Sequence, residues 1–313
     1  MNKIAFVFSG QGAQYTGMGK ELYASEDCVK SIFDTIDGSL QRKISDICFY
    51  GSDDEQGKTI NTQPCVFAMD IAVAKLLKSK GVNPQGVAGF SLGEYAALCF
   101  SDAISVSEGA LLVQKRANAM QNAVPEGRGA MAAIIGIDAK DVARMCDEEK
   151  DQYIAISNYN SPQQIVVAGE NEAIDRFIER ISANGGRGVK LAVSVPSHCA
   201  LMKSAADEVK LILDNIVMKS PQYPIYFNYS GETSSDISDI KNMMVNQIQY
   251  PVKWTQTIER MYNDGFDVFI ECGPGKTLTG LIKKILKGKD FEVYHVEDAD
   301  TLMKVVCAVK DGN

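Results

Sequence analysis

This chain of 313 residues has few histidines, no closely spaced pair of cysteines and no long apolar run. No apolar run reaches the roughly 18 residues that a membrane-spanning helix needs, so the sequence does not predict an integral membrane protein. The first apolar stretch, at residues 4–8, gives way at once to a glycine-rich turn. It is too short for a signal peptide and is typical of a buried first strand.

The eight cysteines are scattered, and none belongs to a C-x-x-C pair. In a chain of this length that pattern predicts reduced thiols in a cytoplasmic protein, without a disulfide framework or a zinc site. The formal net charge of −8 argues against a general nucleic-acid binder. The length suits one large domain or a domain with an insert.

Short apolar segments alternate with longer amphipathic ones in the first 125 residues. This alternation predicts an α/β architecture, a mainly parallel sheet flanked by helices, with a core similar to that of α/β-hydrolases. Pro64 is expected to open its helix, because the N–H that proline lacks is not needed in a first turn. The expected strands are 4–8 and 87–90, and the expected helices are 17–24, 64–80, 92–100 and 107–124.

The pattern changes between residues 127 and 191, where the expected elements follow the order βαββαβ of a ferredoxin-like unit. We therefore interpret residues 126–195 as a small ferredoxin-like domain inserted into a large α/β catalytic domain made of residues 1–125 and 196–313. A cleft between two domains is a common place for a ligand site. The expected elements of the insert are strand 129–137, helix 138–149, strands 153–157 and 164–168, helix 171–184 and strand 187–193. Beyond it we expect helices at 200–216, 243–248 and after 276, and a strand at 268–271.

Residues 89–93 read Gly-Phe-Ser-Leu-Gly, between a short apolar stretch and the first turns of a predicted helix. This is the G-x-S-x-G nucleophile elbow, in which a strained strand-to-helix turn projects a serine hydroxyl beside helix N-terminal amides. Ser91 is therefore a candidate nucleophile. The same spacing also occurs in ordinary loops, so the motif alone leaves both readings open.

A nucleophilic serine needs a base, and the chain contains only two histidines. His198 lies at a predicted domain crossing just before a helix, whereas His295 lies in a strand-like alternation near the C-terminus. A lone histidine is more often structural than catalytic, but a Ser91 nucleophile requires a partner, and this favours His198. The rival interpretation is a serine hydrolase or thioesterase that uses His295 as its base.

Gln11 and Arg116 are two further candidates. Gln11 follows the first predicted strand between two glycines, at the sheet edge where ligands collect, so its backbone N–H can face a reacting oxygen. A glycine-flanked turn without chemistry is the equally favoured alternative on local evidence. Arg116 shares an apolar helix face with Leu112 and Met120. A guanidinium on such a face requires an anion, either an internal carboxylate or a substrate.

Seven segments, in order and from end to end of the chain, resemble the malonyl-CoA:acyl carrier protein transacylase family. Two positions depart from the family pattern: Phe90 stands where histidine is usual, and Ser9 stands where proline is usual. The segments are residues 6–12, 89–94, 114–116, 160–164, 196–202, 246–247 with 251–254, and 271–275.

The resemblance implies a role for each catalytic group. Ser91 would carry the acyl group, with His198 as general base and then general acid. The second ring nitrogen of His198 would be held by the backbone carbonyl of Gln247. The backbone N–H groups of Gln11 and Leu92 would form the oxyanion hole.

The resemblance also implies the substrate. Arg116 would bind the free carboxylate of malonyl, and Asn160 and Met120 would line the acyl pocket. The implied reaction transfers malonyl from malonyl-CoA to the phosphopantetheine thiol of acyl carrier protein through a malonyl-serine intermediate. Fatty acid synthesis is the expected pathway and polyketide synthesis the alternative, and no cofactor, nucleic acid or membrane is expected.

The carrier protein of this family is usually acidic, and so is this chain, so docking requires a local basic patch. Four lysines near the last predicted core helix are candidates for it. The alternative is that they form an ordinary solvated helix face. They are Lys283, Lys284, Lys287 and Lys289.

Overall fold

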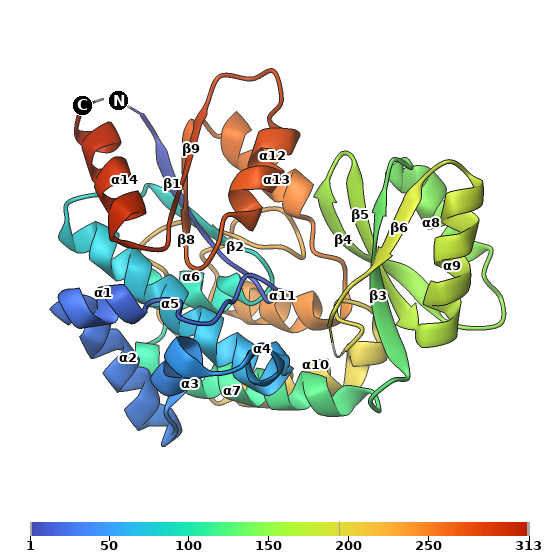
Figure 1. Ribbon diagram of the computed structural model, residues 1–313, viewed down its shortest axis with the longest axis horizontal. Coiled ribbons are helices and arrows are strands. Elements are labelled where there is room, and N and C mark those ends of the chain that lie inside the picture. The colour runs from blue at the N-terminus through green and yellow to red at the C-terminus, as the bar shows by residue number, and fades with distance from the viewer. Residues whose placement is uncertain (1, 194, 312–313) are drawn as a thin grey trace.

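The computed structural model describes residues 2–193 and 195–311 and contains two sheets (Figure 1). The larger sheet is parallel throughout and has the strand order β7–β2–β1–β8–β9. Its central strands are buried along their whole length, as expected for parallel strands covered on both faces. The strands are β1 (Ile4–Phe8), β2 (Gly86–Gly89), β7 (Ile225–Tyr226), β8 (Val268–Cys272) and β9 (Glu292–Val296).

The alternating side chains of β1 divide the core of this domain into two layers. Phe6 and Phe8 belong to a large cluster with the helices of one face, and Ala5 and Val7 to a second cluster with those of the other. The first face carries α1 (Lys20–Ser25), α2 (Asp27–Leu40), α3 (Ile44–Tyr50), α5 (Thr59–Ser79), α6 (Gly93–Phe100), α7 (Val106–Ala123), α10 (Lys203–Asp214), α11 (Ile237–Gln249) and α14 (Ala299–Asp311). The second face carries α12 (Trp254–Asn263) and α13 (Thr277–Ile285). The short elements α4 (Asp53–Gly57) and η1 (Ala200–Met202) complete the set.

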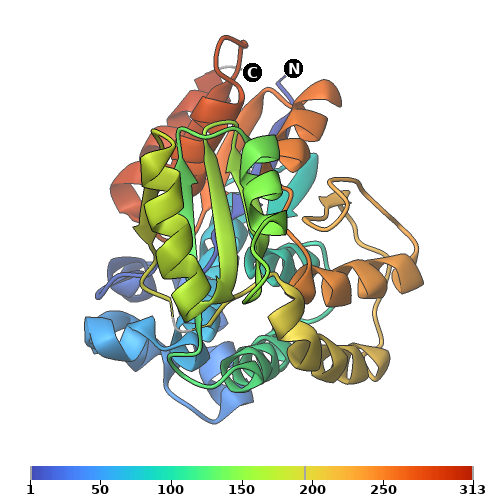
Figure 2. The same ribbon diagram turned by 90° about the vertical axis from the view of Figure 1, so that its right-hand side faces the viewer.

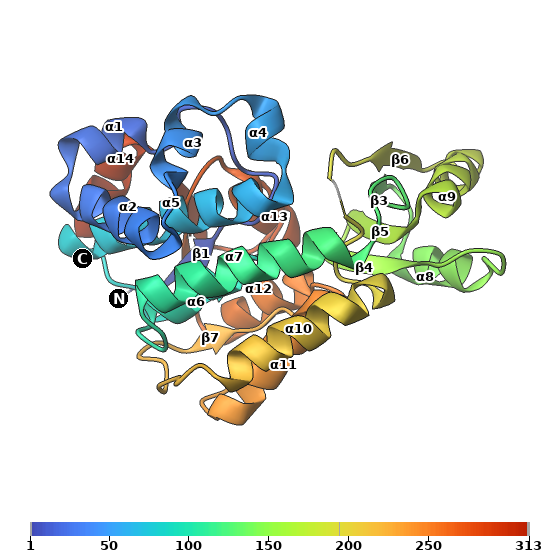
Figure 3. The same cartoon turned by 90° about the horizontal axis from the view of Figure 1, so that it is seen from below.

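Helix α7 positions Arg116 and is defined at its start by the local sequence. Ser105 accepts a hydrogen bond from the Glu108 backbone N–H, and the Glu108 carboxylate accepts one from Ser105, which completes a capping box. The helix then runs beside α10, which in turn lies beside α11 (Figure 3). This row leads toward the small domain.

The inserted segment forms the predicted ferredoxin-like βαββαβ unit, an antiparallel sheet of order β4–β5–β3–β6 (Figure 2). Helices α8 and α9 pack on its outer face around a cluster that includes Ile134, Ile156 and Phe177. The elements are β3 (Gly129–Ile135), α8 (Ala139–Asp147), β4 (Ile154–Ser161), β5 (Gln164–Glu170), α9 (Asn171–Ala183) and β6 (Arg187–Lys190). The boundaries 126 and 195 stay a prediction, and Ser194, beside the second, lies outside the described residues.

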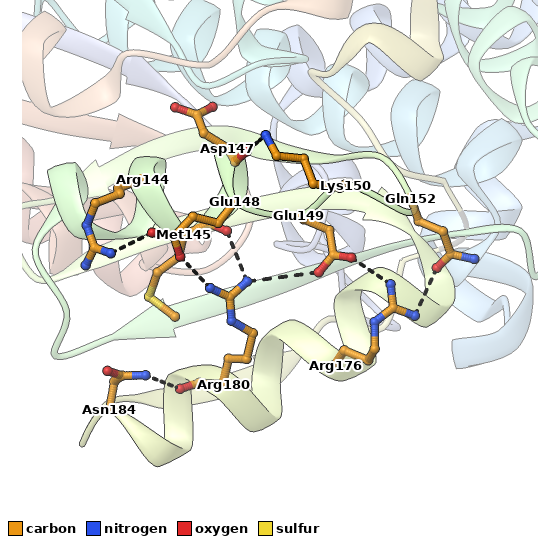
Figure 4. Close-up of polar contacts among 10 residues, drawn as sticks. All are labelled: Arg144, Met145, Asp147, Glu148, Glu149, Lys150, Gln152, Arg176, Arg180 and Asn184. Carbon is orange, nitrogen blue, oxygen red and sulfur yellow. Dashed lines mark hydrogen bonds and ion pairs between the residues drawn. The ribbon is translucent and has the colours of Figure 1, made fainter.

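Charged side chains, all at least partly exposed except that of the largely buried Glu149, link the end of α8 and the loop after it to α9 (Figure 4). Arg180 donates to the Met145 carbonyl at 3.2 Å and to Glu148 at 2.8 Å. Arg176 donates to Glu149 at 2.9 Å. The small domain therefore has an apolar centre and a charged outer rim.

The prediction that Pro64 opens a helix is wrong, because α5 begins at Thr59 and contains Pro64 in its second turn. Proline removes the N–H that would bind the Ile60 carbonyl. That oxygen instead accepts hydrogen bonds from Arg42 Nη1 at 3.3 Å and Gln114 Nε2 at 3.2 Å. Two side chains thus replace the missing backbone donor and let the helix continue.

The structure differs from the prediction elsewhere in the extent of its helices. Helix α1 begins at Lys20 and not at residue 17, because Gly17 and Gly19 adopt positive φ angles of 95° and 76°. Helices α2, α3, α4, α12 and α14 and strand β7 were not predicted. Within residues 2–193 and 195–311, no helix combines the length and apolar character needed to cross a membrane.

Candidate active site

Ser91 lies in the turn between β2 and α6 with a left-handed φ of 54°. A Cβ on Gly89 would overlap the backbone of Gly93 and Glu94, and a Cβ on Gly93 would overlap the Phe8 carbonyl. Only glycines therefore allow α6 to approach the strands this closely. The turn holds Ser91 in the strained backbone conformation that a nucleophile elbow requires.

The hydroxyl of Ser91 lies against one of the two histidines. Ser91 Oγ is 2.7 Å from His198 Nε2, and His198 Nδ1 is 2.6 Å from the backbone oxygen of Gln247. Because a carbonyl oxygen only accepts, Nδ1 carries the ring proton and Nε2 is left to accept the proton of Ser91. The arrangement is a serine–histidine pair oriented by a main-chain oxygen.

The protonation state of His198 suits a general base. Burial, and secondly the charge of Arg116, lowers its pKa from 6.5 to about 4, while the hydrogen bond to Gln247 opposes the shift. The imidazole is therefore neutral at pH 7 and able to take a proton from Ser91.

Arg116 brings a positive charge into the same site, where the residue is only 1% exposed. Its Nη2 donates to Ser91 Oγ and to Gln247 Oε1, each at 3.1 Å, and its Nη1 donates to Gln63 Oε1 at 2.7 Å. Its Nε has no hydrogen-bond partner among the described residues. Burial lowers the pKa of this guanidinium, and every group that it contacts by hydrogen bond is neutral.

Three buried side chains fix this arrangement and were not anticipated from the sequence: Gln63, Glu94 and Asn228. Asn228 accepts the Ser91 backbone N–H at 2.6 Å and donates to the Gly89 carbonyl at 2.7 Å. Glu94 accepts a short hydrogen bond from the Asn228 backbone N–H. No recognisable motif surrounds Gln63 or Asn228, whereas Glu94 follows Ser91 closely enough to have been considered with it.

The side-chain amide of Gln247 connects these groups to the rest of the site. Its Nε2 donates to the Ser91 carbonyl at 2.7 Å and to Glu94 Oε2 at 2.6 Å, while its Oε1 accepts from Arg116. Burial raises the pKa of Glu94 to about 8, and the hydrogen bonds from Asn228 and Gln247 oppose that rise. Gln247 thus contacts the nucleophile, the base and the guanidinium.

A cavity of about 200 Å³ opens in front of Ser91, between the two domains. Gln11, Arg116 and Met120 of the large domain and Asn160 of the small domain line it, as expected from the sequence. A larger cavity of about 580 Å³ lies elsewhere, around Lys3 and Gln85 near the start of β1, but no serine, cysteine or histidine lines it. The smaller cavity, which contains Ser91 and His198, is therefore the candidate active site.

The backbone N–H groups of Gln11 and Leu92 donate to no other residue that the structure describes. Gln11 lies just after β1, and its side chain is held by Thr59 Oγ1 at 3.1 Å. Leu92 follows Ser91 and precedes the first turn of α6. Two donors at the edge of the sheet thus have no acceptor among the residues that the structure describes.

The two departures from the family pattern are accommodated differently. Phe90 lines the cavity, and its ring packs edge to face against Trp254 with 5.4 Å between the ring centroids. It therefore gives the pocket an apolar wall. Ser9 is buried, and its hydroxyl donates to the Pro274 carbonyl at 3.4 Å.

The remaining candidates lie outside the cavity. His295 is in β9, where its Nε2 is 3.7 Å from Glu297, so the base beside Ser91 is His198. Within the described residues, no group of three side chains suits a metal ion. The four lysines are exposed on α13 and just after it, and Thr277 and Leu281 of the same helix line the cavity. The lysines are Lys283, Lys284, Lys287 and Lys289.

The chain matches the acyl transferase domain family over residues 5–302. The malonyl CoA-acyl carrier protein transacylase of Bacillus subtilis (strain 168) is 38% identical to it over 316 residues, covering 100% of this chain and 99% of that protein. The malonyl CoA-acyl carrier protein transacylase of Escherichia coli (strain K12) is 39% identical over 289 residues, covering 91% and 94%.

Solved structures give the same result. The malonyl CoA-acyl carrier protein transacylase of Coxiella burnetii superimposes with a TM-score of 0.94 at 34% identity, covering 98% of this chain and 97% of that one. A malonyl-transacylase solved in complex with a type II PKS acyl-carrier protein has a TM-score of 0.95 at 38% identity, covering 98% and 99%. With these matches along nearly its full length, the chain is an acyltransferase that belongs to the malonyl CoA-acyl carrier protein transacylase family.

Proposed function

We propose that this protein transfers the malonyl group of malonyl-CoA to the phosphopantetheine thiol of acyl carrier protein through a malonyl ester of Ser91. One observation carries the proposal. The buried guanidinium of Arg116 lies 3.1 Å from the nucleophilic oxygen and has no carboxylate partner by hydrogen bond among the described residues. A malonyl thioester supplies both the electrophilic carbonyl that Ser91 requires and a carboxylate that can bind Arg116 directly.

In the first half-reaction, Ser91 Oγ attacks the thioester carbonyl while His198 Nε2 takes the hydroxyl proton. The backbone N–H groups of Gln11 and Leu92 stabilise the oxyanion, and each such donor contributes about two to three orders of magnitude in rate. The carbon–sulfur bond then breaks, and His198 returns its proton to the departing CoA sulfur. Malonyl remains on Ser91.

In the second half-reaction, the carrier thiol replaces CoA and the same groups act in reverse. His198 takes the thiol proton as the sulfur attacks the ester, and the collapse of the tetrahedral intermediate returns that proton to Ser91. Transfer of malonyl to the carrier thiol must be faster than hydrolysis of the malonyl-serine ester. The apolar wall formed by Phe90 helps to keep water from that ester.

Arg116 selects the acyl group. A malonyl carboxylate forms charge-assisted hydrogen bonds with the guanidinium, whereas an acetyl group leaves that buried charge unpaired. Asn160 and Met120, which line the cavity from opposite domains, are the proposed walls of the acyl pocket.

The names of the relatives support the proposed partner, an acyl carrier protein. The two curated relatives named above are malonyl CoA-acyl carrier protein transacylases, and one solved structure holds a type II PKS acyl-carrier protein. Fatty acid synthesis in the cytoplasm is the proposed setting, and polyketide synthesis is the alternative. The free cysteines of the described residues agree with a reducing compartment.

Carrier protein is proposed to dock on the exposed lysines of α13 and of the segment just after it, since this helix also lines the cavity. Reversing two of these charges, in Lys283→Glu/Lys287→Glu, is expected to raise the KM for carrier protein while malonyl-CoA still acylates Ser91. An unchanged KM would show that these lysines are not part of the docking surface.

Intact-mass measurement after mixing with malonyl-, methylmalonyl- or acetyl-CoA tests the proposal. We expect one malonyl group per chain, far less acetyl, and no adduct on Ser91→Ala. Arg116→Ala is expected to lose the preference for malonyl over acetyl. An equally labelled Ser91→Ala protein, or no adduct on the wild type, would refute the mechanism.

A further inference from the structure

Glu94 is a fully buried carboxylate that no step of the proposed transfer uses. It lies three residues after Ser91 in the first turn of α6, and its side chain makes no direct hydrogen bond to Ser91, His198 or Arg116 among the described contacts. Its oxygens instead contact Asn228 and Gln247. Each of these two residues is in direct contact with the reacting groups.

Both contacts of Glu94 come from N–H donors, the Asn228 backbone on Oε1 and the Gln247 side-chain amide on Oε2. Burial raises the pKa of Glu94, but a protonated carboxyl would point its O–H at a donor, so this geometry favours the carboxylate. The contact also fixes the orientation of the Gln247 amide. Its nitrogen faces two acceptors, Glu94 and the Ser91 carbonyl, and its oxygen faces the donor Arg116.

We propose that Glu94 is a positioning residue, which orients Gln247 toward Arg116 and Asn228 toward the turn of the nucleophile. Through Gln247 it sets the guanidinium that selects the acyl group. Through Asn228, which accepts the Ser91 N–H and donates to the Gly89 carbonyl, it sets the elbow. This inference rests on the proposed function and names a specificity-determining contact within it.

An isosteric glutamine at this position cannot satisfy both donors. With its oxygen toward Asn228, its NH2 group faces the Gln247 nitrogen, and relief requires Gln247 to flip its own nitrogen toward the Arg116 guanidinium. With its oxygen toward Gln247, its NH2 group faces the Asn228 N–H and disturbs the elbow. Either arrangement breaks one link to the reacting groups.

The test is the acylation rate of E94Q with malonyl-CoA and with acetyl-CoA, followed by intact mass. We expect the malonyl rate to fall by about 10²-fold, the effect of a small misplacement of reacting groups. The ratio of malonyl to acetyl rates is expected to fall by about tenfold, in line with the loss of one Arg116 contact.

E271Q is the matched control. Glu271 is also fully buried and accepts two backbone N–H groups, from Leu278 at 3.0 Å and Thr279 at 2.7 Å, but no hydrogen bond among the described residues joins its side chain to Ser91, His198 or Arg116. We expect E271Q to lower Tm as E94Q does while keeping the wild-type ratio of malonyl to acetyl. A structural role for Glu94 predicts that the two variants behave alike.

If E94Q does not fold, E94D decides between the two roles. Its carboxylate is one methylene shorter and cannot reach both the Asn228 N–H and the Gln247 amide. We expect the ratio of malonyl to acetyl rates to fall as in E94Q, whereas the matched control E271D keeps the wild-type ratio.

A folded E94Q with the wild-type rate and ratio, or an E94D protein with the wild-type ratio, would overturn the inference. A wild-type protein without a malonyl adduct would instead overturn the proposed function.

Discussion

Two polar networks in this protein use similar side chains and differ in their exposure to water. The network around Gln247 joins Ser91, Glu94, Arg116 and His198 in the large domain, and none of these residues is more than 9% exposed. The network around Arg180 in the small domain has side chains that are 35% exposed at Arg180 and 46% at Glu148.

The difference in exposure decides what each network does. Removing charges from water is costly, so a buried network persists where its groups satisfy one another and serve chemistry. Exposed pairs are screened by water and contribute little to stability. The small domain is therefore held by its apolar cluster, whereas the buried network of the large domain sets the reactivity of one serine.

The largest effect on the acylation rate is expected from replacing His198, with His295 as the comparison. His198→Ala removes the base 2.7 Å from Ser91 and should slow acylation by malonyl-CoA by about 10³-fold. His295→Ala lies outside the cavity and should leave that rate unchanged. Rapid-quench measurement of the rate of malonyl-serine formation distinguishes the two variants. An equal loss of rate in both would show that His198 is not the general base.

The second prediction concerns the pH dependence of acylation. Because burial and Arg116 lower the pKa of His198 from 6.5 to about 4, the base is neutral above pH 5 and loses activity only as pH falls through 4. Arg116→Ala removes a repulsive charge and should move this acid limb to higher pH. The measurement uses a neutral ester as acyl donor, because the malonyl carboxylate itself titrates in this range. A wild-type acylation rate that already falls at pH 6.5 would contradict the prediction.

The third prediction concerns Asp70, a buried carboxyl that lacks a network. Neither oxygen has a hydrogen-bond partner among the described residues, and burial, followed by the charge of Glu271, raises its pKa well above 3.8. The native state therefore keeps a proton that the unfolded chain releases, so this group destabilises the fold as pH rises above 3.8.

Asp70→Asn cannot titrate, so its stability relative to wild type should increase with pH by up to about 1.4 kcal/mol per unit. Urea unfolding at pH 5, 6 and 7 measures the difference. Parallel pH profiles for the two proteins would show that Asp70 is ionised in the fold.

The same contrast explains what the sequence predicted. The small domain was predicted element by element, because a two-layer unit with one solvated side shows clear periodicity. Helix α5 was misplaced at its start, because its continuation through Pro64 depends on Arg42 and Gln114, which contact it from elsewhere in the fold. Local sequence does not encode such long-range donors.

Ser91, His198 and Arg116 were proposed from the sequence because a motif, the rarity of histidine and a charge on an apolar face each mark a residue. The structure brings all three together. Gln63 and Asn228 carry no such mark, since a buried amide differs from an exposed one only through its tertiary contacts. The supporting groups of the site therefore required coordinates.

The smallest expected effect tests the exposed network directly. Arg180→Gln removes a part-buried hydrogen bond to the Met145 carbonyl and an exposed one to Glu148, while the cluster around Phe177 keeps its side chains. We expect Tm to change by no more than about 2 °C and malonyl transfer to stay at the wild-type rate. Differential scanning calorimetry at low and high salt measures the change. A large, salt-sensitive loss would mean that the rim stabilises the small domain, and exposure would then no longer separate the two networks.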